Sequence, residues 1–392
     1  MKKEKVLIVH NYYKIPGGED TVVANEKKLL EDNGHEVILY SRNNSELEGM
    51  GIFKKLLMVF FTIFNIKTYM DVKKIIKEKS IDIVHVHNTL NLISPSVYYA
   101  ALKCKIPVVQ TIHNFRLLCP AATFYRNGHI CEDCINKGLY SAIKYSCYRN
   151  NRLYTLGCVL TLRIHRFIGI YKKINYICLT DFNKKKLMML DKFIDINRVY
   201  VKPNFVIRKS NDPINIKRKN QFVFVGRLDL LKGIDILLKA WKKVDYGVGN
   251  LVICGTGPMS GWCDEFIKVN KLENVELLGF VENNIVRKII SESKALILPT
   301  QWYEGFPMTI VESYSEGTPV IGSDIGNTGS LIINKLTGMK FKANSIEELT
   351  SVINSFDNVK DEFNVFDFYT KNYNYNENYN ILRKIYTECL NK

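Results

Sequence analysis

The chain has 392 residues, of which 46% are hydrophobic, 24% charged and 11% aromatic. This ordinary globular composition excludes a disordered chain, a collagen-like repeat and a small disulfide scaffold, and the length predicts two or three domains. Lys and Arg (55) outnumber Asp and Glu (39), which gives a formal net charge of +16 and favours an anionic partner such as nucleic acid, an anionic membrane surface or a phosphorylated substrate.

The first half of the chain alternates short apolar runs with helical patterns. The apolar runs predict buried parallel strands at residues 6–10, 37–40, 81–88, 106–114, 174–180 and 199–204. Between the first two runs, a helical stretch begins after PGGED and ends at Gly34. Strands that alternate with helices indicate a doubly wound α/β domain, so we predict an N-terminal Rossmann-like domain over residues 1–207.

A polar and basic stretch at residues 208–220 interrupts this pattern and is expected to be a linker. A second series of apolar strands follows in QFVFVGRL, LVICGTGP, VELLGF, ALILPT and TPVIGSD, with a helix through IDILLKAWKKV. This series predicts a second Rossmann-like domain over residues 221–372. The tail, at about 373–392, has apolar residues at helical spacing, and we expect this helix to complete the N-terminal domain.

Two features bear on localisation. The N-terminus lacks the long apolar core of a signal peptide, so we expect a cytoplasmic protein with reduced cysteines. Residues 51–80 combine flanking lysines with the apolar run LLMVFFTIF, which is shorter than the ~18 residues that span a bilayer. This segment is either a helix half buried against the N-terminal sheet or an interfacial helix at the inner face of the cytoplasmic membrane.

Open α/β sheets bind ligands beyond the carboxyl ends of their strands, and polar residues stand at several of these ends. Gly17 and Gly18 precede a helix, where backbone N–H groups either approach an anion or simply form a tight turn. His113 follows the strand that ends in QTI and either contacts a substrate or is structural. Arg227 and Lys232 follow the first strand of the second series and suit a diphosphate, although paired surface cations are common.

The stretch PTQWYEGFPMTIVESYSEGTPVIGSD carries the strongest signal. Glu304 and Glu312 are two carboxylates in otherwise apolar surroundings, and Gly305, Phe306 and Pro307 lie between them. Glycine lets the backbone approach a ligand closely, and carboxylates are paired acceptors for sugar or ribose hydroxyls. The stretch therefore indicates a sugar or nucleotide site.

In their order along the chain, these motifs resemble those of the family 4 glycosyltransferases, which are retaining enzymes that use nucleotide sugars and have the GT-B architecture. The resemblance extends over nearly the whole chain and rests on PGGED, VQTIHNFR, KPNFV, VGRLDLLKG, CGTGP, LGF, EGFPMTIVE and GTPVIGSDIGN. It implies an α/β fold with two Rossmann-like doubly wound domains facing each other across a cleft. The first would be the acceptor-side domain and the second the nucleotide-sugar-binding domain.

The resemblance also implies a role for each residue that matches a family motif. Arg227 and Lys232 would bind the donor diphosphate, and Glu312 would hold the donor ribose hydroxyls. His113 and Glu304 would be the catalytic residues beside the transferred sugar. Further donor contacts would come from Gly17, Gly18, Gly279, Phe280, Gly305, Phe306 and Pro307.

Four of the 10 cysteines lie in one insert at residues 119–147, namely Cys119, Cys131, Cys134 and Cys147. A Cys-x-x-Cys pair with two further cysteines fits a tetrahedral structural zinc site. Four reduced thiols in a loop, or a redox disulfide, are the alternatives. Because the insert follows His113, we expect it to border the acceptor cleft.

We therefore predict a retaining hexosyltransferase that moves a sugar from a nucleotide-diphosphate sugar, with UDP favoured, to a lipid-linked saccharide of a surface polysaccharide such as capsule or O-antigen. No Asp-x-Asp triplet occurs in the sequence, so we expect metal-independent catalysis without a cofactor. A nucleotide-sugar epimerase on the same fold is the alternative. A nucleic-acid-binding protein is disfavoured, because the basic residues do not form one stripe with interleaved aromatics.

Overall fold

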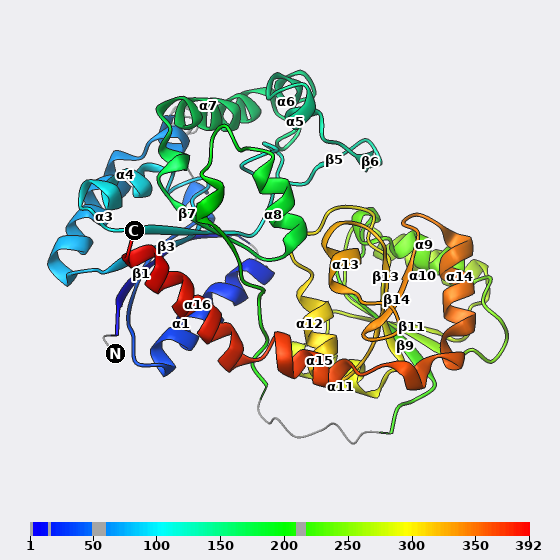
Figure 1. The fold of residues 1–392 in the computed structure, drawn as a ribbon. Coiled ribbons are helices and arrows are strands. Elements are labelled where there is room, and N and C mark those ends of the chain that lie inside the picture. Colours follow the sequence, from blue (N-terminus) through cyan, green and yellow to red (C-terminus); the bar gives the residue numbers. More distant parts are fainter. Residues whose placement is uncertain (1–2, 15–16, 49–59, 209–216) are drawn as a thin grey trace. The chain divides into compact units, whose positions relative to one another are not determined.

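The computed structural model describes residues 3–14, 17–48, 60–208 and 217–392. The chain divides into two units (Figure 1). The first comprises residues 1–126, 130–204 and 375–392, and the second comprises residues 127–129 and 205–374. Each unit contains a six-stranded sheet whose neighbouring strands are parallel. The predicted α/β class is confirmed.

The first sheet has the strand order β2-β1-β3-β4-β7-β8. Each of its strands overlaps one of the six predicted runs, with bounds that differ by up to three residues. The strands are β1 (Lys5–Tyr12), β2 (Glu36–Asn43), β3 (Ile83–Asn88), β4 (Val108–Ile112), β7 (Asn175–Cys178) and β8 (Val199–Val201). Every residue of the central strands β3, β4 and β7 is buried. Such strands are expected where helices cover both faces of a parallel sheet, which explains their continuous apolar runs.

The helices of the first unit are α1 (Gly18–Asp32), α3 (Ile66–Lys79), α4 (Ser96–Lys103), α5 (Asp133–Asn136), α6 (Tyr140–Lys144), α7 (Arg152–Ile168), α8 (Asp181–Met188) and α16 (Tyr375–Leu390). The last helix, α16, lies beside α1 (Figure 1). It begins within the Asn/Tyr-rich stretch and buries Leu382, Ile385 and Tyr386. The C-terminal end of the chain is therefore part of the first unit's core.

The second sheet has the strand order β11-β10-β9-β12-β13-β14. Its strands are β9 (Gln221–Val225), β10 (Asn250–Cys254), β11 (Val275–Gly279), β12 (Ala295–Leu298), β13 (Val320–Ser323) and β14 (Gly338–Phe341). The helices are α9 (Ile234–Trp241), α10 (Ser260–Val269), α11 (Asn283–Glu292), α12 (Met308–Ser315), α13 (Gly326–Leu331), α14 (Ile346–Ser355) and α15 (Val365–Asn372). The sequence analysis misses β14, an edge strand of four residues with a half-buried centre.

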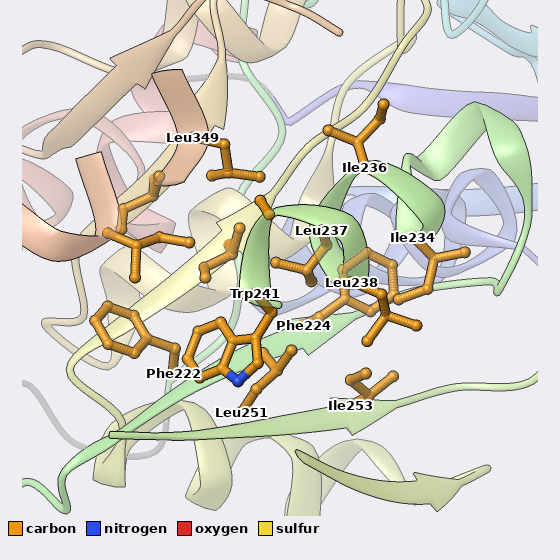
Figure 2. Packing of buried hydrophobic residues seen from close by; sticks show 14 of the residues in the cluster. Phe222, Phe224, Ile234, Ile236, Leu237, Leu238, Trp241, Leu251, Ile253 and Leu349 are labelled. Atoms are coloured by element: carbon orange, nitrogen blue, oxygen red, sulfur yellow. The ribbon is translucent and has the colours of Figure 1, made fainter. Parts of the chain in front are cut away.

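Helix α9 shows how the apolar pattern builds the core of the second unit. It is apolar on almost all sides because it packs against α10 and α14 as well as the sheet. Trp241 meets Phe222 of β9 edge to face, with ring centroids 5.8 Å apart. Leu251 and Ile253 of β10 lie in the same cluster (Figure 2). This packing holds β9 and β10 in place, and the loops that follow these strands carry the candidate site.

Two predicted segments are described only in part. Residues 51–59 of the membrane-related segment and residues 209–216 of the linker lie outside the described residues. Within α3, Val72 and Ile76 are buried, whereas Ile66 and Met70 are exposed. In the described stretches of the chain, no helix combines the length and the hydropathy that a membrane span requires.

Candidate functional site

The loops that follow β9, β10 and β12 are joined to one another at the carboxyl edge of the second sheet. The Gly226 N–H donates to the Cys254 carbonyl at 3.0 Å, and the Leu228 N–H donates to the Thr256 carbonyl at 3.0 Å. The Gln301 N–H donates to the carbonyl of Leu231 at 2.9 Å. These backbone contacts make the three loops one rigid support for the side chains they carry.

Glycines allow this close approach. A Cβ atom on Gly233 would lie 1.8 Å from the carbonyl oxygen of Pro299, and one on Gly255 would lie 1.9 Å from that of Gly226. A Cβ on Gly257 would lie 2.3 Å from the carbonyl oxygen of Leu228. The GRLDLLKG and CGTGP motifs therefore have their glycines at points where two backbones touch.

Lys232 and Glu304 form the centre of this loop cluster. The Lys232 ammonium lies 2.8 and 2.7 Å from the two carboxylate oxygens of Glu304, which is only 6% exposed. The Asp229 carboxylate accepts from the Lys232 N–H at 2.9 Å and fixes the turn. Asn327 of α13 donates to the carbonyls of Glu304 and Gly305, each at 2.6 Å. The sequence analysis did not select Asn327, although it lies within the GTPVIGSDIGN motif.

Arg227 lies in the same loop but faces solvent. Its side chain is 64% exposed and pairs with the Asp229 carboxylate. Because a guanidinium has five N–H donors, it can keep this contact and still bind a second anion. Arg227 and Lys232 thus provide an exposed and a half-buried cation in one loop, as a diphosphate would require.

Glu312 lies in α12, whose N-cap is Pro307. Burial raises the pKa of its carboxyl group, and Asn283 of α11 donates to it at 3.3 Å. Phe306 packs against the apolar cluster beneath the helix. The structure therefore places Glu304 on the loop before α12 and Glu312 within the helix, each with its own polar partner.

Gly279 is the last residue of β11, and Phe280 follows it. Gly279 has a φ of +66° and accepts a hydrogen bond from the Gly255 N–H at 2.7 Å, so it belongs to the same edge as the loop cluster. Phe280 is 81% exposed. An aromatic ring that is exposed at a ligand edge offers a flat apolar face on which a base can stack.

In the first unit, His113 follows β4 and contacts a row of two buried histidines, His87 and His85, whose rings are stacked. Its Nε2 lies 2.9 Å from Nδ1 of His87, and the two rings are stacked with centroids 5.2 Å apart. Burial lowers the pKa of His113 to about 3, with Glu26 acting in the opposite direction. His113 is therefore a neutral imidazole at physiological pH, able to donate or accept a hydrogen bond but not to act as a cation.

The row of histidines ends at a buried carboxylate, Glu26 of α1. Burial opposes its ionisation, but Lys202 at 2.9 Å and His85 at 2.9 Å hold the pKa of Glu26 well below its usual range. Asn378 of α16 accepts a hydrogen bond from Lys202 at 2.9 Å. The last helix thus supplies a hydrogen-bond partner to the ion pair. The sequence analysis missed this arrangement because Glu26, Lys202 and Asn378 come from three distant segments.

A cavity of about 80 Å³ lies at the carboxyl ends of β3 and β4, within the first unit. His87, Asn88, His113 and Arg116 line it, and α7 contributes Thr161. The cavity brings His113 and Arg116 of the VQTIHNFR motif to a single space, where polar groups can meet a small ligand. Of these residues, only His113 was selected from the sequence.

The glycine pair near the N-terminus caps α1. The Gly17 N–H donates to the Asp20 carboxylate at 2.9 Å, and a Cβ atom at Gly17 would meet nothing within 4 Å. The unit's own packing therefore does not demand glycine at this position. The adjacent Glu19 accepts from the Tyr13 hydroxyl at 3.1 Å, and burial raises the pKa of its carboxyl group to about 8.

Of the four insert cysteines, Cys119 is buried and Cys131, Cys134 and Cys147 are half-buried. Cys134 and Cys147 pack against the small apolar cluster of Leu139, Ala142, Val159 and Leu162. Among the described residues, which include all four cysteines, no three of these sulfurs lie within 4.8 Å of one another.

Comparison with known proteins gives a consistent result along the chain. The family model described as Glycosyltransferase Family 4 matches residues 16–130, and the model described as Glycosyl transferases group 1 matches residues 206–371. The chain is 26% identical over 358 residues to an uncharacterized glycosyltransferase of Methanocaldococcus jannaschii, with 89% of this chain and 87% of the relative covered.

Two further proteins match the chain over most of its length. An uncharacterized 41.2 kDa protein in the cps region of Klebsiella pneumoniae is 24% identical over 360 residues, which covers 89% of each chain. The solved structure of Anabaena HepE in complex with UDP superimposes with a TM-score of 0.66 at 14% identity, covering 98% of this chain and 100% of that chain. At that identity the likeness concerns the fold alone.

Proposed function

Because the chain belongs to the family 4 glycosyltransferases with the GT-B fold, we propose that it is a retaining, metal-independent hexosyltransferase of surface-polysaccharide biosynthesis. The proposed donor is a UDP-sugar, and the proposed acceptor is a lipid-linked saccharide. Support for the donor comes from Anabaena HepE, which was solved with UDP. Support for the pathway comes from the Klebsiella relative, which is described by its place in a cps region.

The loop cluster around Lys232 and Glu304 is the observation that carries this proposal. Arg227 and Lys232 would neutralise the donor diphosphate in the ground state and stabilise the charge that grows on it as the sugar leaves. Because both cations are held on glycine-built loops, little reorganisation is needed when the charge develops. These protein cations take the part that a divalent metal has in other transferases, in line with the absence of an Asp-x-Asp triplet.

The remaining donor contacts would follow the edge of the second sheet. Glu312 would accept hydrogen bonds from the ribose hydroxyls, and Phe280 with Gly279 would meet the base. Glu304 and the backbone of Gly305 would contact the transferred sugar, with Phe306 and Pro307 forming the turn into α12. In this proposal the second unit binds the donor.

The first unit, which includes the C-terminal helix, would bind the acceptor. His113 would contact the transferred sugar as a neutral hydrogen-bonding group, and Gly17 and Gly18 would approach the diphosphate through backbone N–H groups. The nucleotide diphosphate would leave through an oxocarbenium-like state, and the acceptor hydroxyl would attack from the same face. The exposed Ile66 and Met70 of α3, beside its lysines, support peripheral contact with an anionic membrane.

A thermal-shift screen with EDTA present tests the donor class. We expect UDP or a UDP-sugar to raise the melting temperature in the chelator, because a ligand that binds only the folded state stabilises it by mass action. Arg227→Ala should abolish the shift, whereas Lys371→Ala, an exposed cation on α15, should leave it unchanged. The proposal fails if no nucleotide or nucleotide sugar shifts the protein at millimolar concentration.

Product analysis then separates transfer from epimerisation. A labelled UDP-sugar incubated with a lipid-linked saccharide should pass its label to the lipid fraction, in the anomeric configuration of the donor. Conversion of the sugar without any acceptor would identify an epimerase instead. Inversion of the anomeric centre would contradict the retaining mechanism.

A further inference from the structure

His113 uses only one of its two ring nitrogens in contacts with the described residues. Its Nε2 lies 2.9 Å from Nδ1 of His87. Its Nδ1 has no hydrogen-bond partner in the described part of the chain and is not one of the buried polar atoms there that lack a partner, so a ligand can reach it. His113 also lines the cavity at the carboxyl ends of β3 and β4. What His113 offers a ligand depends on whether Nδ1 bears a proton.

The contact between His87 and His113 holds a single proton. Both imidazoles are neutral, because burial lowers the pKa of each, to about 3 for His113 and well below the usual range for His87. A neutral imidazole has one N–H donor and one acceptor nitrogen. At 2.9 Å, one nitrogen of the contact donates and the other accepts. The tautomer of His87 therefore determines that of His113.

The carboxylate of Glu26 selects the tautomer of His87. Its Oε2 is paired with the Lys202 ammonium at 2.9 Å, which favours the ionised form. Its Oε1 lies 2.9 Å from Nδ1 of His85 and 3.6 Å from Nε2 of His87. An ionised oxygen has only lone pairs, so away from water it attracts an N–H group and repels a second lone pair. Nε2 of His87 therefore bears the proton.

This choice is passed on to His113. With its proton on Nε2, His87 presents the lone pair of Nδ1 to Nε2 of His113, which must then donate. The rings of His85, His87 and His113 are stacked in succession, with centroids 4.5 and 5.2 Å apart, and this packing fixes their orientations. Nδ1 of His113 is left as an acceptor, which can bind a hydroxyl group but is repelled by a carbonyl or an ionised phosphate oxygen.

We propose that Glu26, acting through His87, holds the proton of His113 on Nε2, so that Nδ1 accepts a hydrogen bond from a hydroxyl of the transferred sugar. Glu26 and His87 are positioning residues in this arrangement, because they act on the substrate through His113. The contact with the sugar rests on the proposed function, whereas the tautomer is a property of the protein without substrate.

A metal ion at the same side chains would have the opposite effect. Glu26, His85 and His87 form the one group of three metal-ligating side chains among the described residues whose ligand atoms lie within 4.8 Å of one another. A metal on Nε2 of His87 would leave the proton of His87 on Nδ1 and that of His113 on Nδ1 as well. The Lys202 ammonium, 2.9 Å from Glu26, already neutralises this carboxylate, which favours the arrangement without a metal.

Nitrogen NMR of the full chain, with isotope-labelled histidine and no substrate, tests the tautomer. The protonated and bare nitrogens of a neutral imidazole have well-separated resonances, and the His113 signals are those that disappear in His113→Gln. We expect the proton on Nε2 of His113, with and without a chelator. A proton on Nδ1, or a proton that moves from Nδ1 to Nε2 when the chelator is added, would overturn the proposal.

Glu26→Gln should invert the tautomer. The Lys202 ammonium would hold the glutamine carbonyl, so the glutamine NH₂ group would face Nε2 of His87 where a lone pair of Oε1 stands in the wild-type protein. His87 and then His113 would each carry the proton on Nδ1. Glu78→Gln, at an exposed carboxylate of α3, should leave the His113 signals unchanged. A folded Glu26→Gln protein with the wild-type tautomer would refute the role of Glu26, and the wild-type spectrum decides the tautomer even if this variant does not fold.

Deoxy and fluoro analogues of the donor sugar test the hydroxyl that Nδ1 binds. In the wild-type enzyme, one deoxy analogue should lose about 3- to 10-fold in kcat/KM, and the matching fluoro analogue, which cannot donate, should lose as much. In His113→Ala this loss should be absent. A fluoro analogue that is transferred as well as the parent sugar would contradict the acceptor role of Nδ1. Absence of transfer from every UDP-sugar would instead overturn the proposed function, and the NMR result would not be affected.

Discussion

At the scale of single residues, the first unit depends on charges that are buried together. Glu26 and Lys202 are each 1% exposed in their side chains and lie 2.9 Å apart. The desolvation of two buried ions is compensated only while both are present with their hydrogen-bond partners. The pair therefore specifies how α1, the segment after β8 and α16 come together.

Lys202→Met should destabilise the first unit by about 3–5 kcal/mol, because it leaves the Glu26 carboxylate buried without its cation. Urea unfolding measures this free energy. The double variant Glu26→Gln/Lys202→Met should recover most of the loss, and Lys371→Met, at an exposed lysine of α15, should change little. A single variant as stable as the Lys371 control would contradict this account of the pair.

The carboxyl group of Glu19 should make stability depend on pH. Its pKa is about 8 in the folded chain, against an ordinary value of 4.5. A raised pKa means that the group stabilises the fold fully below pH 4.5 and that this contribution is lost as pH rises through about 8. The melting temperature of Glu19→Gln should therefore fall less between pH 5 and 8 than that of the wild-type protein.

The matched control for Glu19 is Glu36→Gln, a substitution at the exposed end of β2. Melting temperatures of all three proteins, measured at intervals across this pH range, give the comparison. If Glu19→Gln and Glu36→Gln follow the same pH dependence, the Glu19 carboxyl group is not held in its protonated form.

At the scale of elements, the candidate donor site is a property of loops rather than of the strands that carry them. The strands β9, β10 and β12 set the spacing, but the contacts between their following loops occur at glycines. Helix α13 then fixes the carbonyls of Glu304 and Gly305 through Asn327. A side chain added at one of these glycines should disturb several donor contacts at once.

Gly233→Ala tests this dependence, with Gly247→Ala as its control. Both glycines have left-handed backbone, at φ +71° and +87°, so each alanine has the same conformational strain. Only the Cβ at Gly233 meets another atom within 4 Å, 1.8 Å from the Pro299 carbonyl, whereas that at Gly247 meets nothing. We expect Gly233→Ala to cost about 1–3 kcal/mol more than the control.

The same pair of variants should differ in ligand binding. Gly233→Ala should weaken the thermal shift by UDP or a UDP-sugar, because Lys232 precedes it directly, and Gly247→Ala should leave the shift intact. Equal stabilities and equal shifts would show that the loops adapt and that their close contact is not required.

At the scale of the whole molecule, the chain returns to its first unit at the end. Residues 205–374 lie between the two parts of that unit, which is completed only by α16. Tyr386 then reaches His85 at 2.7 Å, and Asn378 reaches Lys202. The first unit therefore cannot complete its core until the whole second unit has been synthesised.

Leu382→Ala should destabilise the first unit by about 2–5 kcal/mol, because this side chain is fully buried under α16. Leu390→Ala, near the end of the same helix and 39% exposed, should cost less than about 0.5 kcal/mol. Unfolding followed by limited proteolysis, with fragments assigned to each unit, measures the effect. Equal proteolysis of the two variants would show that α16 contributes little to the first unit.

Several features could be predicted from the sequence because they depend on local pattern. The buried strands follow from continuous apolar runs such as VLIVH and ALIL, and the loop positions follow from glycines and polar residues just after them. This was enough to select Arg227, Lys232, Glu304 and Glu312 at one edge of a sheet. The short edge strand β14 was missed because four residues with a half-buried centre have no distinct periodicity.

The way in which distant residues combine emerges only from the folded chain. The stacking of His113 on His87 and the charge balance between Glu26 and Lys202 both join segments that are separate along the chain. Local propensity and periodicity do not predict such contacts, because the contacts depend on strand order, on loop geometry and on the exclusion of water. The class of fold and the edge where a ligand would bind follow from the sequence pattern, whereas the protonation states and ion pairs of the site arise from burial, which exists only after folding.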